Sequence, residues 1–211
     1  RPLRTDRQSL HQGSGMGVGR WSIAMMKRLV ASLVVGFAIL FHVPPLLAWE
    51  LAGTKNVVLH SREGQRIPLG TINFQPAGSK TAFTLNLEPE RFKDFFLSMK
   101  EFKCLESAQE VQCHVPYPYP NPATVSADDL VWLEHSLLFF YKAPRDFGAR
   151  LWNGLYYRMK ITEQGIVGTP QAIDLVQMGA PPVDPSIPPF GTDGRSDIVP
   201  ESRWFYRLTI E

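Results

Sequence analysis

Apolar and polar residues alternate along much of the chain after residue 49, and this alternation predicts strands. Phe83, Leu85 and Leu87 fall on one face of the segment 81–87, while the residues between them are polar. A strand that is buried on one face requires this period of two. Similar patterns predict further strands at residues 57–61, 67–74, 137–142, 155–161, 166–176 and 204–210.

Two of these strands have special features. Residues 67–74 contain Pro68 and Gly70, which weaken a regular strand, so we expect an edge strand or a bulged one. Residues 155–161 and 166–176 flank a short turn that contains Gly165, and this is the clearest hairpin in the chain.

A first helix is predicted at residues 92–99. Phe92, Phe95, Phe96 and Met99 recur at the three, four and seven spacing of one helix face. Pro89 lies where a first helical turn tolerates proline. We expect this aromatic stripe to pack on the sheet.

A second helix is predicted after residue 126. Ser126 and Asp129 have the spacing of a capping box, and the helix would run through Leu130 and Leu133. Residues 137–142 either continue this helix or form a strand. We favour the strand because Phe139, Phe140 and Tyr141 are strand formers.

The two cysteines are predicted to form one disulfide within a hairpin. If the chain turns at residues 108–109, Cys104 lies opposite Cys113, close enough for a disulfide. The eight intervening residues do not match the two-residue spacing of thiol oxidoreductases. Metal ligation by these cysteines and His114 would need a further ligand that no nearby motif supplies.

These elements predict a mainly β fold of the α+β type. About eight or nine strands and two short helices suit a single antiparallel β-sandwich or a partly open barrel. Helices do not alternate with strands, which argues against a parallel nucleotide-binding sheet. We therefore expect residues 49–211 to form one β-rich domain.

Residues 25–48 have the pattern of a secretory signal peptide. Two basic residues precede a largely apolar run at 29–41, and Pro44, Pro45 and finally Ala48 follow. The run is shorter than the roughly 20 residues that span a bilayer. We expect cleavage after Ala48 and therefore no transmembrane anchor in the mature chain. A buried helix or an uncleaved anchor is the alternative reading.

The signal places the mature protein outside the cytoplasm, in the periplasm of a diderm bacterium or secreted from another cell. Residues 1–24 do not begin with Met, and we interpret them as an upstream, non-native segment.

Removal of residues 1–48 changes the sign of the net charge. The whole chain has 22 basic and 20 acidic residues, and the removed part holds six of the basic ones and one of the acidic ones. The 16 basic and 19 acidic residues that remain give a net charge of −3. We therefore expect no nucleic acid among the partners.

No motif assembles a catalytic or metal site. The histidines fall in no zinc-ligand spacing, and no G-x-S-x-G elbow is present. The weak candidates for catalysis are His114, His135, Asp128 and Asp129. We expect no cofactor and no metal.

Aromatic residues in the predicted loops are the candidate binding residues. Tyr117 and Tyr119 alternate with prolines, and Trp152 and Phe190 lie in other irregular segments. Aromatic side chains with a polar group are typical anchors for ligands or partners. The alternative is that these segments fold back and cover one end of the sheet.

Three functions remain open at this point. The leading hypothesis is an exported, non-catalytic protein that binds a small apolar ligand or a cell-envelope partner. The second is an exported hydrolase whose site assembles from distant residues. The third is a structural envelope component that acts by association.

Overall fold

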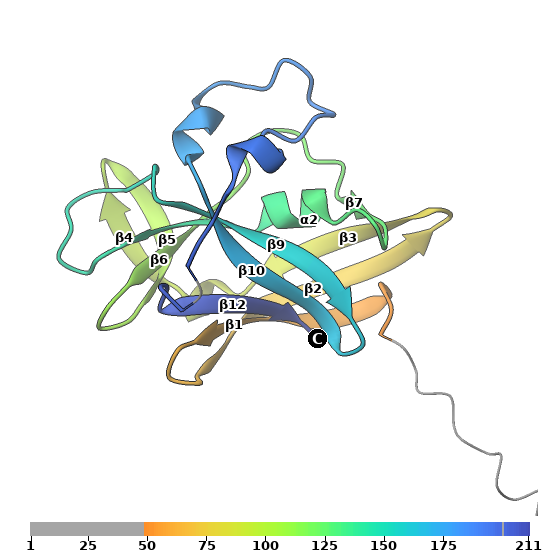
Figure 1. The fold of residues 1–211 in the computed structure, drawn as a ribbon, viewed down its shortest axis with the longest axis horizontal. Coiled ribbons are helices and arrows are strands. Elements are labelled where there is room, and N and C mark those ends of the chain that lie inside the picture. Colours follow the sequence, from red (N-terminus) through yellow and green to blue (C-terminus); the bar gives the residue numbers. More distant parts are fainter. Residues whose placement is uncertain (1–48, 200) are drawn as a thin grey trace, which may run out of the picture. The chain divides into compact units, whose positions relative to one another are not determined.

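The structure is a computed structural model that describes residues 49–199 and 201–211. The predicted upstream segment and signal peptide lie outside the described residues. Within the described part, the strands form one antiparallel sheet that does not close on itself (Figure 1). The prediction of a mainly β, antiparallel fold with one disulfide is confirmed.

The sheet contains twelve strands in the order β4-β5-β6-β8-β9-β10-β12-β1-β2-β3-β7, and β11 pairs with β10 beside this path. The strands are β1 Gly53–Ser61, β2 Arg66–Ala77, β3 Lys80–Leu87, β4 Lys93–Leu97, β5 Lys100–Glu106, β6 Val111–Val115, β7 Thr124–Val125, β8 Leu138–Lys142, β9 Gly154–Thr162, β10 Gly165–Ile173, β11 Ser196–Asp197 and β12 Phe205–Ile210. The last of them, β12, lies between β10 and β1.

The predicted strands and their clearest hairpin are confirmed. Strands β9 and β10 pair over their whole length, and Thr162 lies opposite Gly165 across a two-residue turn. Strand β2 is bulged, as predicted, but it lies inside the sheet between β1 and β3. Gly70 is required there because its φ is 148° and a Cβ would lie 2.1 Å from the carbonyl oxygen of Asn86.

The predicted helix at residues 92–99 is wrong. A short 3-10 helix, η1 (Pro89–Arg91), leads directly into strand β4, whose five residues all pair with β5. The spacing misled because Phe95 is partly buried while Phe96 is 76% exposed, which is the alternation of a strand. Pairing with β5 supplies the backbone partners that a helix would have supplied.

The second predicted helix is present but shorter. Helix α2 covers Val131–Ser136, while Ser126 and Asp129 pair with each other as a β-bridge. Asp129 Oδ1 accepts a hydrogen bond of 3.1 Å from the amide of Val131. The expected strand at 137–142 is confirmed as β8.

Two further 3-10 helices, η2 (Leu175–Gly179) and η3 (Thr192–Gly194), lie in the long segment between β10 and β11. No helix in the described part of the chain is both long and apolar enough to cross a membrane.

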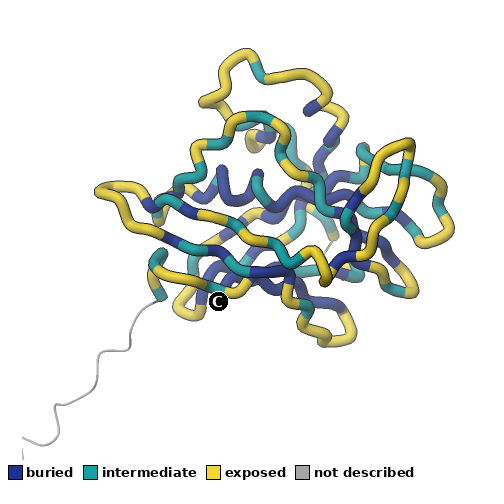
Figure 2. Tube along the Cα trace, turned by 180° about the vertical axis from the view of Figure 1, so that it is seen from behind, coloured by how far each residue is buried: buried dark blue, intermediate teal, exposed yellow. Residues whose placement is uncertain are grey.

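Strands β8 and β9 are buried on both faces, so the sheet carries two hydrophobic cores. Neighbouring residues point to opposite faces of a strand, yet Phe139, Phe140, Tyr156 and Tyr157 are all fully buried. Phe139 and Tyr157 belong to one core, and Phe140 and Tyr156 belong to the other. Figure 2 shows this buried centre with exposed loops around it.

The first core extends over β1, β2 and β12 and includes residues of α2. The second core lies over β5, β6 and β8 and contains the disulfide, with Met178 of η2 and Phe190 packed against it. Each core therefore holds segments that are far apart in the sequence.

The predicted disulfide joins Cys104 to Cys113. The two residues lie directly opposite each other in the register of β5 and β6, and both are fully buried. The bond closes a short loop at the edge of the second core.

We expect the double variant Cys104→Ala/Cys113→Ala to lose roughly 2.5 to 3 kcal/mol of unfolding free energy, because the unfolded chain regains the entropy of the open loop. Urea unfolding followed by tryptophan fluorescence measures this loss. A reducing agent should destabilise the wild type similarly and leave the double variant unchanged. Equal stability of the oxidised wild type and the variant would contradict the expectation.

Candidate functional site

Three of the four predicted aromatic binding residues belong to one cluster with His135, in which Tyr117 and Phe190 contact the histidine and Tyr119 contacts Tyr117. The ring of Tyr117 lies 5.7 Å from those of Tyr119 and His135, and the ring of Phe190 stacks on His135 at 5.7 Å. Phe190 is fully buried, while the two tyrosines are half-buried. Trp152 lies apart from them, on the loop between β8 and β9.

The tyrosine hydroxyls are used differently. Tyr119 donates a 2.7 Å hydrogen bond to the carbonyl oxygen of Met178 and so ties the proline-rich segment to η2. The hydroxyl of Tyr117 is buried and has no hydrogen-bond partner among residues 49–199 and 201–211. In this arrangement the segment covers the second core.

Both ring nitrogens of His135 are engaged. The amide of Phe190 donates to Nε2 at 3.4 Å, so Nε2 must be the unprotonated nitrogen. Nδ1 then donates to the carbonyl oxygen of Val131 at 2.7 Å. Burial, together with the positive charge of nearby Arg195, lowers the pKa of His135 from 6.5 to about 4.

The remaining catalytic candidates do not meet around one groove. His114 Nε2 lies 3.3 Å from the carbonyl oxygen of Ser136, and burial lowers the pKa of His114. Asp128 and Asp129 line an open groove of about 490 Å³, and neither His114 nor His135 is among the described residues that line it.

Glu134 is a buried acid that the sequence reasoning missed. Its Oε1 accepts a 2.6 Å hydrogen bond from the amide of Met159, and its Oε2 accepts from the hydroxyl of Tyr156. Burial raises the pKa of Glu134. These bonds join α2 to β9, which makes Glu134 a structural link on the helix that also carries His135.

No described group of three or more His, Cys, Asp or Glu side chains is arranged to hold a metal ion. The groove between β9–β10 and residues 196–206 measures about 540 Å³ and carries the charged residues Arg158, Lys160 and Arg203 on its walls. Its walls also carry the carboxylates of Asp197 and Glu201 and the apolar side chains of Ile198 and Val199, so its lining is mixed.

A different groove combines apolar and cationic residues. It lies between the β4–β5 hairpin and the loop after β8, and its volume is about 640 Å³. The amide of Ala149 donates a 3.0 Å hydrogen bond to Ser98 Oγ and joins the two segments, which lie side by side at one end of the sheet (Figure 1). The groove is lined by Phe95, Phe96, Leu97, Ser98, Lys142, Pro144, Arg145, Asp146, Phe147 and Gly148.

Large apolar side chains are exposed around this groove. Phe96, Met99 and Phe147 are 76%, 90% and 96% exposed, and we call these three residues the apolar tips. Trp152, on the same loop as Phe147, is 56% exposed. Together with Phe96 and Phe147 it accounts for all the exposed Phe and Trp residues in the described part of the chain.

The turn of the β4–β5 hairpin holds one tip in a strained conformation. Leu97 pairs with Lys100, so the turn consists of Ser98 and Met99 alone. Both have positive φ, 49° and 66°, a combination that a type I′ hairpin turn requires and that glycine or asparagine normally supplies. The turn therefore presents Met99 to solvent at a conformational cost.

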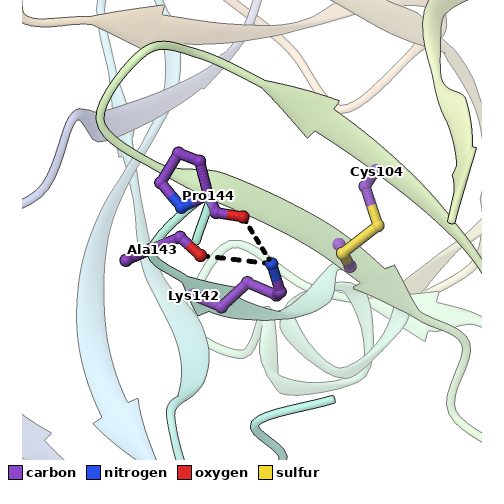
Figure 3. The surroundings of a disulfide bond; sticks show 5 residues. Cys104, Lys142, Ala143 and Pro144 are labelled. Atoms are coloured by element: carbon purple, nitrogen blue, oxygen red, sulfur yellow. Dashed lines mark hydrogen bonds between the residues drawn. A yellow bond between two sulfur atoms is a disulfide. The ribbon is translucent and has the colours of Figure 1, made fainter. Parts of the chain in front are cut away.

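Lys142 places a buried charge at the groove. The residue is only 3% exposed, and its Nζ donates to the carbonyl oxygens of Ala143 at 3.1 Å and Pro144 at 3.4 Å (Figure 3). Among the described residues no carboxylate oxygen lies within 4.0 Å of this Nζ. The nearby Asp146 pairs with Arg150 instead, at 3.7 Å. The groove thus offers an incompletely compensated positive charge to an anion.

The sequence reasoning identified Trp152 but not the other residues of this site. For Phe96 and Met99 the sequence predicts a helix face that packs on the sheet. Phe147 did have a local signal, because it is an aromatic residue between Asp146 and Gly148 in a polar loop. The burial of Lys142 follows from pairing β8 with β6, which no local pattern reveals.

We expect His135 to make the fold sensitive to acid. The folded-state pKa of His135, about 4, lies below the ordinary histidine value of 6.5 that applies to the unfolded chain. As the pH falls, the unfolded state therefore binds the proton first. The stability that neutral His135 contributes is lost as the pH falls from 6.5 to about 4. At about 1.4 kcal/mol per pH unit this amounts to roughly 3 kcal/mol.

The measurement is urea unfolding of the wild type and of His135→Gln across this pH range. The stability advantage of the wild type should shrink as the pH falls. Glu110 and Glu134 have raised pKa values, so their contribution to stability grows as the pH falls. Both proteins contain these two residues, so subtracting the unfolding free energy of the variant from that of the wild type removes their contribution. Parallel pH profiles of the two proteins would show that His135 does not titrate in this way.

Comparison of the chain with protein-family models, with curated proteins and with solved structures found no match.

Proposed function

We propose that this chain is an exported, non-catalytic protein that binds a component of the cell envelope through the groove between the β4–β5 hairpin and the loop after β8. One observation carries the proposal. Two of the apolar tips, Phe96 and Phe147, line a groove that also holds Lys142, a buried lysine with no carboxylate partner among the described residues. A partner that covered this groove would relieve both unfavourable features.

Exposed apolar side chains favour contact with a partner rather than with water. Burying one large apolar side chain contributes about 1.5 to 3 kcal/mol, and clusters of such residues on a protein surface are typical of interaction sites. The strained turn at Ser98–Met99 supports the same interpretation, because strain persists where a local geometry serves a function.

Binding is also favoured over hydrolysis. A histidine that acts as a general base needs a free nitrogen within reach of its substrate. Both ring nitrogens of His135 are engaged, and His114 uses Nε2 for a backbone carbonyl. The exported hydrolase is therefore the weaker candidate.

Export belongs to the proposal as well. It rests on the signal-peptide pattern of residues 25–48. The disulfide between Cys104 and Cys113 supports it because such bonds persist mainly in oxidising compartments.

The proposal predicts that the protein fractionates with the cell envelope through the apolar tips. We expect Phe96→Ser/Phe147→Ser to move the protein from the envelope fraction to the soluble fraction of the producing cell, because the variant loses two apolar contacts. Quantitative immunoblotting of the two fractions measures the change.

The matched control is Val183→Ser/Ile187→Ser, which alters two exposed aliphatic residues outside the groove, 105% and 61% exposed. This variant should fractionate as the wild type does. The proposed function is wrong if the wild type is soluble throughout, or if both variants leave the envelope to the same extent.

A further inference from the structure

We propose that the occupant of this groove is the surface of an anionic phospholipid bilayer, with headgroup phosphates near Lys142 and Arg145 and the apolar tips inserted between the lipids. This inference rests on the proposed function and names the envelope component. Three observations support the inference: the uneven charge distribution, the cations beside the apolar side chains, and the placement of the apolar tips on two separate segments.

The charge of the domain is distributed asymmetrically. Residues 93–106 and 142–152 form the hairpin and the loop around the groove, and they hold six basic and four acidic side chains, a net charge of +2. The rest of residues 49–211 holds ten basic and fifteen acidic side chains, a net charge of −5. A molecule with this dipole turns the groove toward an anionic surface.

Cations stand directly beside the apolar tips. Lys100 follows Met99, and Arg145 lies two residues before Phe147. Lysine and arginine at such positions reach the headgroup layer while apolar neighbours enter the acyl boundary. This combination is characteristic of proteins that lie on a membrane without crossing it.

The groove itself offers a place for a phosphate. Lys142 is nearly buried, and within the described part of the chain its charge meets two backbone carbonyls and no carboxylate, while Arg145 lines the same groove. An anionic headgroup would balance the positive charge of Lys142, and the guanidinium of Arg145 could donate two hydrogen bonds to its phosphate. The carboxylate of Asp146 is already paired with Arg150, so it leaves both cations available.

The apolar tips lie on two separate segments, a hairpin turn and an exposed loop. In Figure 2 both segments are exposed along their outer edges. A deformable lipid surface accommodates separated tips without a matching shape, whereas a protein partner would need pockets for them. Free inorganic phosphate would use the cations alone and would leave the tips in water.

The test is sedimentation of the protein with vesicles of phosphatidylcholine alone and of phosphatidylcholine mixed with phosphatidylglycerol. The chain is recovered from the producing cell and its amino terminus is read by mass spectrometry. All variants share whatever precedes residue 49, so a difference in vesicle binding between them arises from the substituted groove residues. We expect clear binding to the mixed vesicles, little binding to phosphatidylcholine, and weaker binding as salt is raised.

Four variants test the named contacts. Phe96→Ser and Phe147→Ser should each lower the affinity for mixed vesicles about tenfold or more, and Arg145→Gln should lower it about fivefold. Val183→Ser and Lys80→Gln are the matched controls outside the groove and should bind as the wild type does. Lys142→Gln should resemble Arg145→Gln, and its urea unfolding checks that it folds.

Three outcomes would overturn the inference: no binding of the wild type to mixed vesicles, equal binding to both kinds of vesicle, or binding that the tip variants do not alter. Competition by inorganic phosphate without any effect of the tip variants would identify a phosphate site instead. If vesicle binding fails while the tip variants still leave the envelope fraction, the partner is an envelope protein and the proposed function survives. If both fail, both proposals fall.

Discussion

The burial of β8 and β9 on both faces is the constraint on which the rest of the structure depends. Phe139 and Tyr157 are buried in one core, and their neighbours Phe140 and Tyr156 are buried in the other, so the sheet must be covered on both faces. One face is covered by α2 and the strands around β1, and the other by the disulfide hairpin, η2 and the segment that ends at Phe190. The long irregular segments of the chain therefore stabilise the fold, since they cover apolar surface that water would otherwise contact.

Hydrogen bonds of two polar residues on helix α2 join the elements that cover the two faces of the sheet. Glu134 accepts bonds from β9, and His135, the next residue, accepts the amide of Phe190. Buried polar groups are costly unless they are paired, so these bonds fix the helix and the segment in one arrangement. They also explain why both ring nitrogens of His135 are committed to the fold.

The sequence predicts those parts of the fold that depend on local alternation. Strands such as β3 and the β9–β10 hairpin follow from a period of two, and the disulfide follows from the hairpin around it. The segment 92–99 could not be predicted correctly, because a few aromatic residues match both a helix face and a strand until the partner β5 is known. The candidate site depends on that same pairing and on the approach of Ala149 to Ser98, which is a contact between segments about fifty residues apart.

The position of β12 has a consequence for the order of events during folding. Residues 205–210 separate β10 from β1 and pair with both, so the sheet consists of two unconnected halves until this last strand has been made. Contacts of such long sequence separation form late and slow the folding reaction. On a ribosome, the two half-sheets would therefore stay separate until residues 205–210 had been synthesised, and neither half could complete the first core before then.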